Sequence, residues 1–97
     1  MLFTYTFEPS GMTAEQYDTI IQKLEKAGAG APKGRLYHVC YGDRNNLGVL
    51  DVWDSKENFD EFGKTLMPIL QQEGVDPGQP QVQIVHNIIE AVAELHV

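Results

Sequence analysis

The stretch Val49-Leu-Asp-Val-Trp-Asp-Ser-Lys-Glu-Asn-Phe-Asp-Glu-Phe62 contains a strand that leads directly into a helix. Strand-forming residues continue to Trp53, and Ser55 is a favoured N-cap residue with the acidic Glu57 in the first turn. Apolar side chains then recur at helical spacing, at Phe59, Phe62, Leu66 and Ile69. We therefore predict a strand over about 47–54, followed by an amphipathic helix that packs back on the sheet.

The same patterns occur on both sides of this unit. A strand is predicted over 2–7, and Thr13-Ala-Glu-Gln16 matches a capping box before a first helix that ends near Gly28. Further strands are predicted over 34–41 and 81–89, and Pro68 predicts a kink or break in the second helix. The order β-α-β-β-α-β is typical of an α+β, ferredoxin-like fold, a four-stranded antiparallel sheet with two helices on one face.

Composition limits the class of protein. Residues 1–97 are predicted to form a single domain, with 90–97 a short C-terminal extension that is either helical or disordered. The chain has 14 Asp and Glu against 7 Lys and Arg and no basic cluster, so we expect neither a nucleic-acid nor a membrane partner. It lacks a signal peptide pattern and the roughly 20 apolar residues of a membrane span, so we expect a cytoplasmic protein. The single Cys40 argues against a disulfide framework and a cysteine-based zinc cluster.

The last predicted strand is apolar on both of its faces, with Val82, Ile84 and Ile88 on one and Val85 and Ile89 on the other. Two helices on one side of the sheet leave the other side without a cover. We expect a second copy of the chain to supply it, forming a homodimer through the open sheet face.

Polar residues interrupt these apolar strands at a few positions. If Gly42 pairs with Leu47, His38 lies opposite Asp51, and a carboxylate beside an imidazole fixes its tautomer and raises its basicity, as in a general base. A shift of one residue would place the two side chains on opposite faces. The alternative is structural: His38 is a core histidine, and Asp51 is its hydrogen-bond partner or a solvated edge residue.

A second polar pair, His86 and Asn87, interrupts the last strand, and its two side chains point to opposite faces. In this topology the second and fourth strands are the edges of the sheet, so His86 and His38 of one subunit are too far apart to form one cluster. An interface or edge hydrogen bond is the alternative role for His86. No ligand spacing typical of a metal site is present.

The tract Val52-Trp53-x-Ser55 followed by Phe59, within this order of elements, resembles the dimeric α+β barrel superfamily and, within it, the antibiotic-biosynthesis-monooxygenase group. The resemblance implies a homodimer whose sheets close into a barrel, a ligand pocket between each sheet and its own helices, and Trp53 as a pocket residue. Activities in this superfamily include cofactor-independent oxygenation of polyphenols or quinols, haem degradation, and isomerisation or decarboxylation of small cyclic compounds. The haem-degrading members need an Asn on the first strand and a His on the second helix. This chain has neither, so a haem-binding protein ranks last.

These observations predict a small-molecule enzyme of the monooxygenase-like type that acts on an aromatic or cyclic organic substrate without a metal or other cofactor. The reaction is an oxygenation or a proton-transfer isomerisation, with His38 as the catalytic base and Asp51 as its orienting partner. The predicted substrate-binding residues are Trp53, Phe62, Tyr5, His86 and Asn87. The alternative is a non-catalytic ligand-binding or dimerisation module of the same fold. A cavity that encloses both His38 and Asp51 would favour the enzyme.

Overall fold

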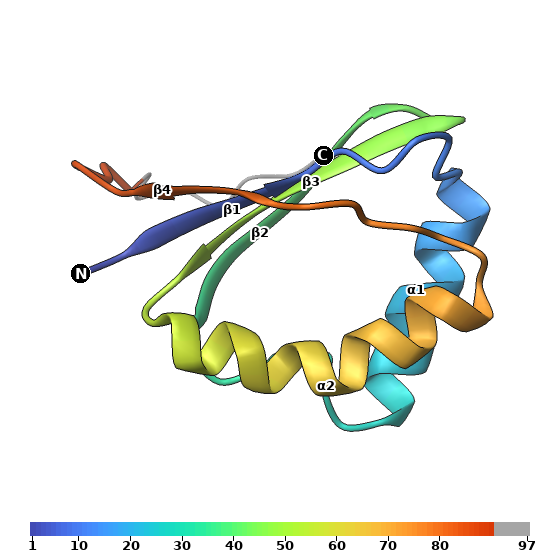
Figure 1. Ribbon diagram of the computed structural model, residues 1–97, viewed down its shortest axis with the longest axis horizontal. Helices are drawn as coiled ribbons and strands as arrows, with labels where there is room; N and C mark the ends of the chain where they lie inside the picture. Colours follow the sequence, from blue (N-terminus) through green and yellow to red (C-terminus); the bar gives the residue numbers. More distant parts are fainter. Residues whose placement is uncertain (91–97) are drawn as a thin grey trace.

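The computed structural model describes residues 1–90, and the predicted elements occur in the predicted order. They are β1 (Phe3–Phe7), α1 (Ala14–Lys26), β2 (Arg35–Asp43), β3 (Asn46–Trp53), α2 (Lys56–Gln72) and β4 (Gln81–Ile84). The strands form an antiparallel sheet in the order β2-β3-β1-β4, so β2 and β4 are its edges. Both helices lie on the same side of this sheet (Figure 1), which confirms the α+β, ferredoxin-like fold.

Both helices begin at the caps that the sequence predicts. The Thr13 side chain accepts a hydrogen bond from the Gln16 backbone N–H at 3.1 Å, and the Gln16 side chain accepts one from the Thr13 N–H at 2.9 Å. The Ser55 hydroxyl accepts from the Asn58 N–H at 3.1 Å. Each cap satisfies backbone donors that the first helical turn leaves unpaired. The local sequence therefore determines where each helix starts.

The second helix does not break at Pro68, because α2 continues through this residue to Gln72. Proline removes one hydrogen bond from the ladder of the helix. Ile69 and Leu70, directly after it, are both buried in the core. Their packing holds the chain helical, since most helical stability in a protein comes from burying the apolar face.

The last strand is shorter than the sequence predicts: β4 ends at Ile84, whereas the pattern continued to Ile89. Ile84 pairs with Phe3, the first residue of β1, and beyond this pair one backbone hydrogen bond remains, from the Val85 N–H to the Leu2 carbonyl oxygen. The length of the partner strand therefore sets the end of β4. The predicted C-terminal extension lies outside the described residues, apart from Glu90.

The β2–β3 hairpin has the register on which the predicted polar pair depends. Gly42 pairs with Leu47, and His38 pairs with Asp51. On the face of the sheet that meets the helices, one row of side chains crosses all four strands and consists of Val82, Tyr5, Asp51 and His38. Two polar residues thus lie side by side on the inner face.

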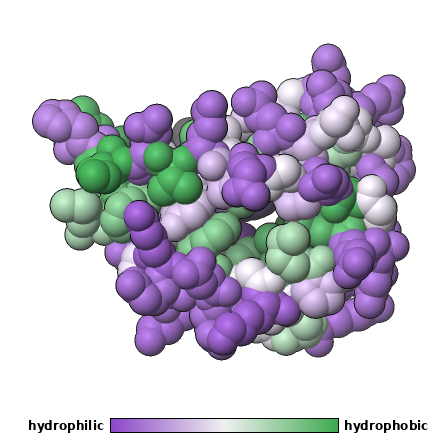
Figure 2. Space-filling view, in the orientation of Figure 1, coloured by the Kyte–Doolittle hydropathy of each residue, from purple (hydrophilic) through white to green (hydrophobic). Residues whose placement is uncertain are grey.

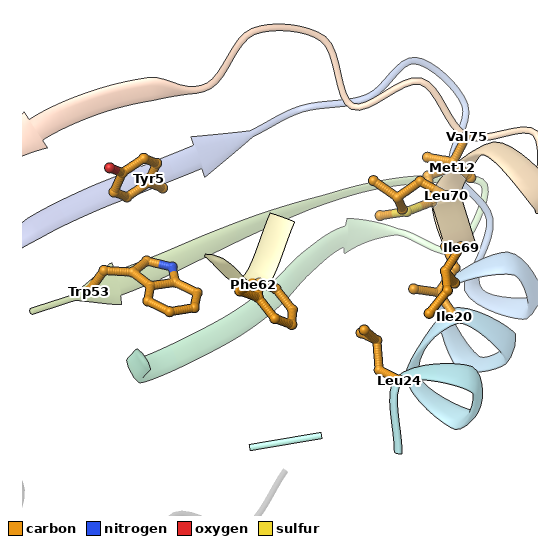
Figure 3. Packing of buried hydrophobic residues seen from close by; sticks show 9 residues of the cluster. All are labelled: Tyr5, Met12, Ile20, Leu24, Trp53, Phe62, Ile69, Leu70 and Val75. Atoms are coloured by element: carbon orange, nitrogen blue, oxygen red, sulfur yellow. The ribbon is translucent and has the colours of Figure 1, made fainter. Parts of the chain in front are cut away.

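The core fills the space between the sheet and the helices at two separate places. In Figure 3, Trp53, Tyr5 and Phe62 lie toward one end, and the remaining core residues lie toward the other, namely Met12, Ile20, Leu24, Ile69, Leu70 and Val75. Trp53 is fully buried, with its ring centroid 5.4 Å from that of Phe62. Burying a large apolar side chain contributes about 2–3 kcal/mol. Both ends of the layer are therefore anchored by packing.

The opposite face of the sheet carries exposed apolar side chains on the edge strand β2. Tyr37, Val39 and Tyr41 alternate with inward-pointing residues, and each is at least 40% exposed. Neither helix covers this face (Figure 1). None of the helices within residues 1–90 is both long and apolar enough to span a bilayer.

Candidate functional site

A cavity of about 730 Å³ lies between the inner face of the sheet and the two helices. Its walls are mostly apolar and include Phe7, Ile20, Ile21, Leu24, Phe59 and Phe62. The space-filling view shows an opening in the middle of one face of the molecule, bordered by apolar side chains and surrounded by polar ones (Figure 2). Pockets for small organic molecules have this size and this balance of apolar walls with a few polar groups.

Three polar side chains form a continuous hydrogen-bonded chain at the wall of this cavity. Asp51 Oδ1 lies 2.5 Å from His38 Nδ1, and His38 Nε2 lies 2.6 Å from the Tyr17 hydroxyl. All three residues line the cavity. The chain joins β3 to β2 and then to α1, so it depends on the hairpin register and on the docking of α1 against the sheet.

Hydrogen bonding assigns the protons of this chain. The Asp51 carboxylate can only accept, so Nδ1 of His38 carries a proton and donates it. In the neutral imidazole Nε2 is then an acceptor, and the Tyr17 hydroxyl donates to it. Burial raises the pKa of Tyr17 to about 12, against the opposing positive field of Arg35, so the phenol keeps its proton at neutral pH.

Asp51 is the one buried charged residue among residues 1–90, with 5% of its surface exposed. An ionised carboxylate is costly to bury unless it is paired, and His38 supplies that pairing. Water still reaches the imidazole, whose side chain is 21% exposed. The hydrogen-bonded chain therefore runs from the buried Asp51 carboxylate to side chains that a ligand in the cavity can contact.

Arg35, at the start of β2, also lines the cavity. Its Nη2 donates to the Gly30 carbonyl oxygen at 3.2 Å, and its guanidinium carbon lies 5.6 Å from the centre of the Phe62 ring. These contacts place a positive charge beside an apolar wall, where arginine stacks favourably on an aromatic face.

The structure brings some of the predicted site residues together and separates others. His38, Asp51 and Phe62 line the cavity. Trp53 and Tyr5 lie behind this wall in the core, where both contact Phe59. The other two, His86 and Asn87, follow the end of β4 and are not part of the lining.

The indole N–H of Trp53 is fully buried and has no hydrogen-bond acceptor within the described part of the chain. A buried donor left unpaired costs about 1–3 kcal/mol. The Phe59 and Phe62 rings, which both line the cavity, pack against the indole ring.

Sequence reasoning missed Tyr17 and Arg35. Tyr17 occupies the apolar face of α1, where its spacing with Ile20 and Ile21 suggests only packing. The available signal was chemical: a tyrosine on a buried helix face usually brings its hydroxyl to a polar partner. Arg35 carried no such signal, because strict strand alternation relative to His38 places it on the outer face.

Within residues 1–90, no group of three or more His, Cys, Asp and Glu side chains is arranged to hold a metal ion. The polar groups that line the cavity are the Tyr17–His38–Asp51 chain and Arg35, together with Asp60, Lys64 and Gln79.

No protein-family model matches the sequence, and no curated protein is detectably similar to it. Solved structures are similar. A candidate antibiotic biosynthesis monooxygenase from Chloroflexus aurantiacus J-10-fl is 14% identical, with a TM-score of 0.66 over 93% of this chain and 98% of that one. SnoaB, a cofactor-independent oxygenase from Streptomyces nogalater, is 11% identical, with a TM-score of 0.60 over 93% and 96%. The similarity at these identities is one of fold, and the chain has the fold of the antibiotic biosynthesis monooxygenase-like proteins.

Proposed function

We propose that the cavity binds a small aromatic or cyclic organic molecule and that the Tyr17–His38–Asp51 chain removes a proton from it, as the first step of a cofactor-independent oxygenation. One observation carries this proposal: a hydrogen-bonded chain from a buried carboxylate to a phenol lies in the wall of an otherwise apolar cavity. A carboxylate behind an imidazole orients the ring and stabilises the cation that forms when the imidazole accepts a proton.

The proton leaves the substrate from an O–H group or from a C–H group next to a carbonyl. Tyr17 contacts the substrate and accepts this proton as its own hydroxyl proton passes to His38 Nε2, so the charge ends on an imidazolium beside Asp51. The electron pair stays on the substrate as a phenolate or enolate. A ring carbon of this anion that carries a hydrogen forms a C–O bond to dioxygen, and the imidazolium returns its proton to the peroxide, which gives a carbon-bound hydroperoxide. Loss of the remaining C–H proton with cleavage of the O–O bond then gives a C=O group and releases water, so one oxygen atom enters the substrate, the other leaves as water, and the substrate supplies all the electrons.

The apolar walls support the same proposal. Phe62 and Phe59 offer flat surfaces for a ring, and a low dielectric strengthens the electrostatic interactions of the polar chain. The fold shared with SnoaB, which is described as a cofactor-independent oxygenase, is consistent with this chemistry. Isomerisation requires the same first step, followed by return of the proton to a different carbon.

We further propose that the protein is a homodimer through the open face of the sheet. An exposed apolar surface lies on this face, which neither helix covers, and consists of Tyr37, Val39 and Tyr41. Apolar surface of this kind is typical of interfaces between protein chains.

The test compares wild type with Asp51→Asn, with Asp43→Asn, an exposed carboxylate at the end of β2, as the matched control. Each protein is incubated in air-saturated D₂O with polyphenols and small cyclic ketones, while oxygen uptake and deuterium incorporation are recorded. We expect wild type and Asp43→Asn to be active, and Asp51→Asn to be slower by at least roughly a hundredfold. Wild type that binds these compounds without oxygen uptake or exchange would favour the non-catalytic binding module instead.

A further inference from the structure

Arg35 reaches the cavity because of an irregularity in the β2–β3 pairing. His38 points inward, so strict alternation would place Leu36 on the same inner face and Arg35 on the outer one. The register shifts between Arg35 and Tyr37, which makes Leu36 an extra residue and pairs Arg35 with Trp53 on the inner face. Leu36 is 52% exposed as a result. Bulges of this kind re-aim a side chain, and here the re-aimed side chain is a cation.

The contacts of Arg35 leave most of its hydrogen-bonding capacity unused. Within the described residues, the one hydrogen bond of its guanidinium goes to the Gly30 carbonyl, and none of the ion pairs there includes it. Arginine normally satisfies its planar fork of donors with a carboxylate or a similar oxyanion. In a chain with a formal net charge of −7, an arginine without a carboxylate partner is conspicuous.

The other charged groups that line the cavity are less suited to bind an anion. The Lys64 ammonium pairs with Glu61 at 2.9 Å and is largely exposed. Asp51 is already paired with His38, and Asp60 is an exposed carboxylate. Arg35 is therefore the cation of this cavity that is free to meet a ligand oxygen.

We propose that Arg35 binds an oxyanion of the ligand, so that the cavity accepts planar aromatic or cyclic acids, molecules that carry a carboxylate or an ionisable ring hydroxyl. This inference rests on the proposed function, since it concerns the same cavity, and it names the substrate class. Guanidinium groups bind such oxygens through two parallel N–H donors.

The geometry of the sheet matches a ring-sized ligand. Arg35 lies opposite Trp53, and His38 lies opposite Asp51, so the two pairs occupy neighbouring rows of the inner face. Such rows are about 7 Å apart along a strand, close to the width of a fused pair of rings. Arg35 also lowers the pKa of Tyr17 against the effect of burial, so its field extends to the hydroxyl that receives the proton. A ligand with its oxyanion on Arg35 thus presents its other edge to Tyr17.

The test uses two probes with the same ring system, 2-naphthoate and its neutral analogue 2-naphthamide, titrated calorimetrically into wild type. Binding in the cavity is verified by a shift of the His38 imidazole signals in nitrogen-15 spectra. We expect naphthoate to bind roughly tenfold to a hundredfold more tightly than the amide. Arg35→Gln loses this preference and Arg35→Lys keeps part of it. Arg44→Gln, which removes an exposed arginine of the hairpin turn, keeps all of it.

A third probe, 7-hydroxycoumarin, distinguishes an ionised hydroxyl from a carboxylate. Its absorbance reports ionisation, and we expect bound probe to ionise at lower pH in wild type than in Arg35→Gln. If wild type prefers naphthoate but does not lower the pH at which the coumarin ionises, the ligands of Arg35 are carboxylates. If the coumarin ionises at lower pH but naphthoate is not preferred, the ligands are acidic phenols.

Equal binding of both naphthalene probes, with no shift in the coumarin, would refute the role of Arg35 and leave the proposed function intact. Anion binding that leaves the His38 signals unmoved would also refute it, because the anion would lie elsewhere. Failure of all three probes to bind wild type would refute both proposals. The comparison of probes on wild type needs no variant, so it holds even if Arg35→Gln folds poorly.

Discussion

The interaction between His38 and Asp51 can be tested by a double-mutant cycle on stability, with His38→Leu, Asp51→Leu and the double variant. His38→Leu leaves the Asp51 carboxylate buried without its partner, and Asp51→Leu leaves a buried N–H of His38 without an acceptor. The double variant removes both polar groups together and replaces them with neighbouring apolar side chains. The Tyr17 hydroxyl loses its acceptor in both His38 variants, so this contribution cancels in the cycle.

The expected magnitude follows from burial. Breaking a fully buried ion pair costs about 3–5 kcal/mol. Asp51 fits that case with its side chain 7% exposed, but the His38 side chain is 21% exposed, and water compensates part of the loss. We therefore expect His38→Leu to lower the free energy of unfolding by about 2–3 kcal/mol and Asp51→Leu by about 1–2 kcal/mol. The double variant should lie within about 1 kcal/mol of wild type, which gives a coupling of at least about 2 kcal/mol.

Urea titrations at one fixed protein concentration measure all four free energies, since any association would shift the midpoints. The control is the same cycle on Lys64 and Glu61, an exposed pair on α2 for which we expect no measurable coupling. Losses at His38 and Asp51 that add to within about 0.5 kcal/mol would show that the two side chains act independently. That result would refute the hydrogen-bonded pair and the proton chain built on it.

Three further predictions concern other parts of the molecule. Burial raises the pKa of Tyr17 from 10.0 to about 12, so the unfolded chain releases this proton first and stability falls as pH rises through that window. After allowance for solvent screening, the free energy of unfolding should fall by roughly 1–2 kcal/mol across this pH range. Urea unfolding should show this fall for wild type and not for Tyr17→Phe. Val39→Lys should weaken dimerisation at least roughly tenfold by sedimentation equilibrium, whereas Met67→Lys, equally exposed on α2, should not. Trp53→Phe removes an unpaired buried N–H, so it should lower the free energy of unfolding by less than about 2 kcal/mol, measured by urea titration.

The fold could be predicted from the sequence because its signals are local. Caps at Thr13 and Ser55, turn residues after Gly42 and the spacing of apolar residues determine where each element starts and which face it buries. The opposition of His38 and Asp51 could be predicted too, since a short hairpin turn fixes the register of the whole ladder. The end of β4 could not, because it depends on the length of a strand far away in the sequence.

The remainder of the site depends on tertiary geometry. Tyr17 meets His38 across 21 residues of sequence, and this contact exists only once α1 docks on the sheet. Arg35 faces the cavity through a bulge, and a single extra residue reverses the alternation on which any face assignment relies. The sequence thus reveals the polar pair within one hairpin, and the structure adds the two residues that make it a candidate site.

Two costs in stability coincide at this place in the fold. A buried carboxylate paired with an imidazole is no more stable than well-packed apolar residues, and Asp51 is the one such charge among residues 1–90. A cavity of about 730 Å³ forgoes the dispersion contacts that a filled core would make. Either feature alone has a structural explanation, because natural proteins are rarely optimised for stability. Here the two features occur together at one wall of the cavity, beside Arg35, which a bulge turns toward the same cavity. A site that binds a ligand and transfers a proton requires this combination. Functional sites are where a protein departs from the usual preference for a fully packed, apolar core, because function needs polar groups held away from water.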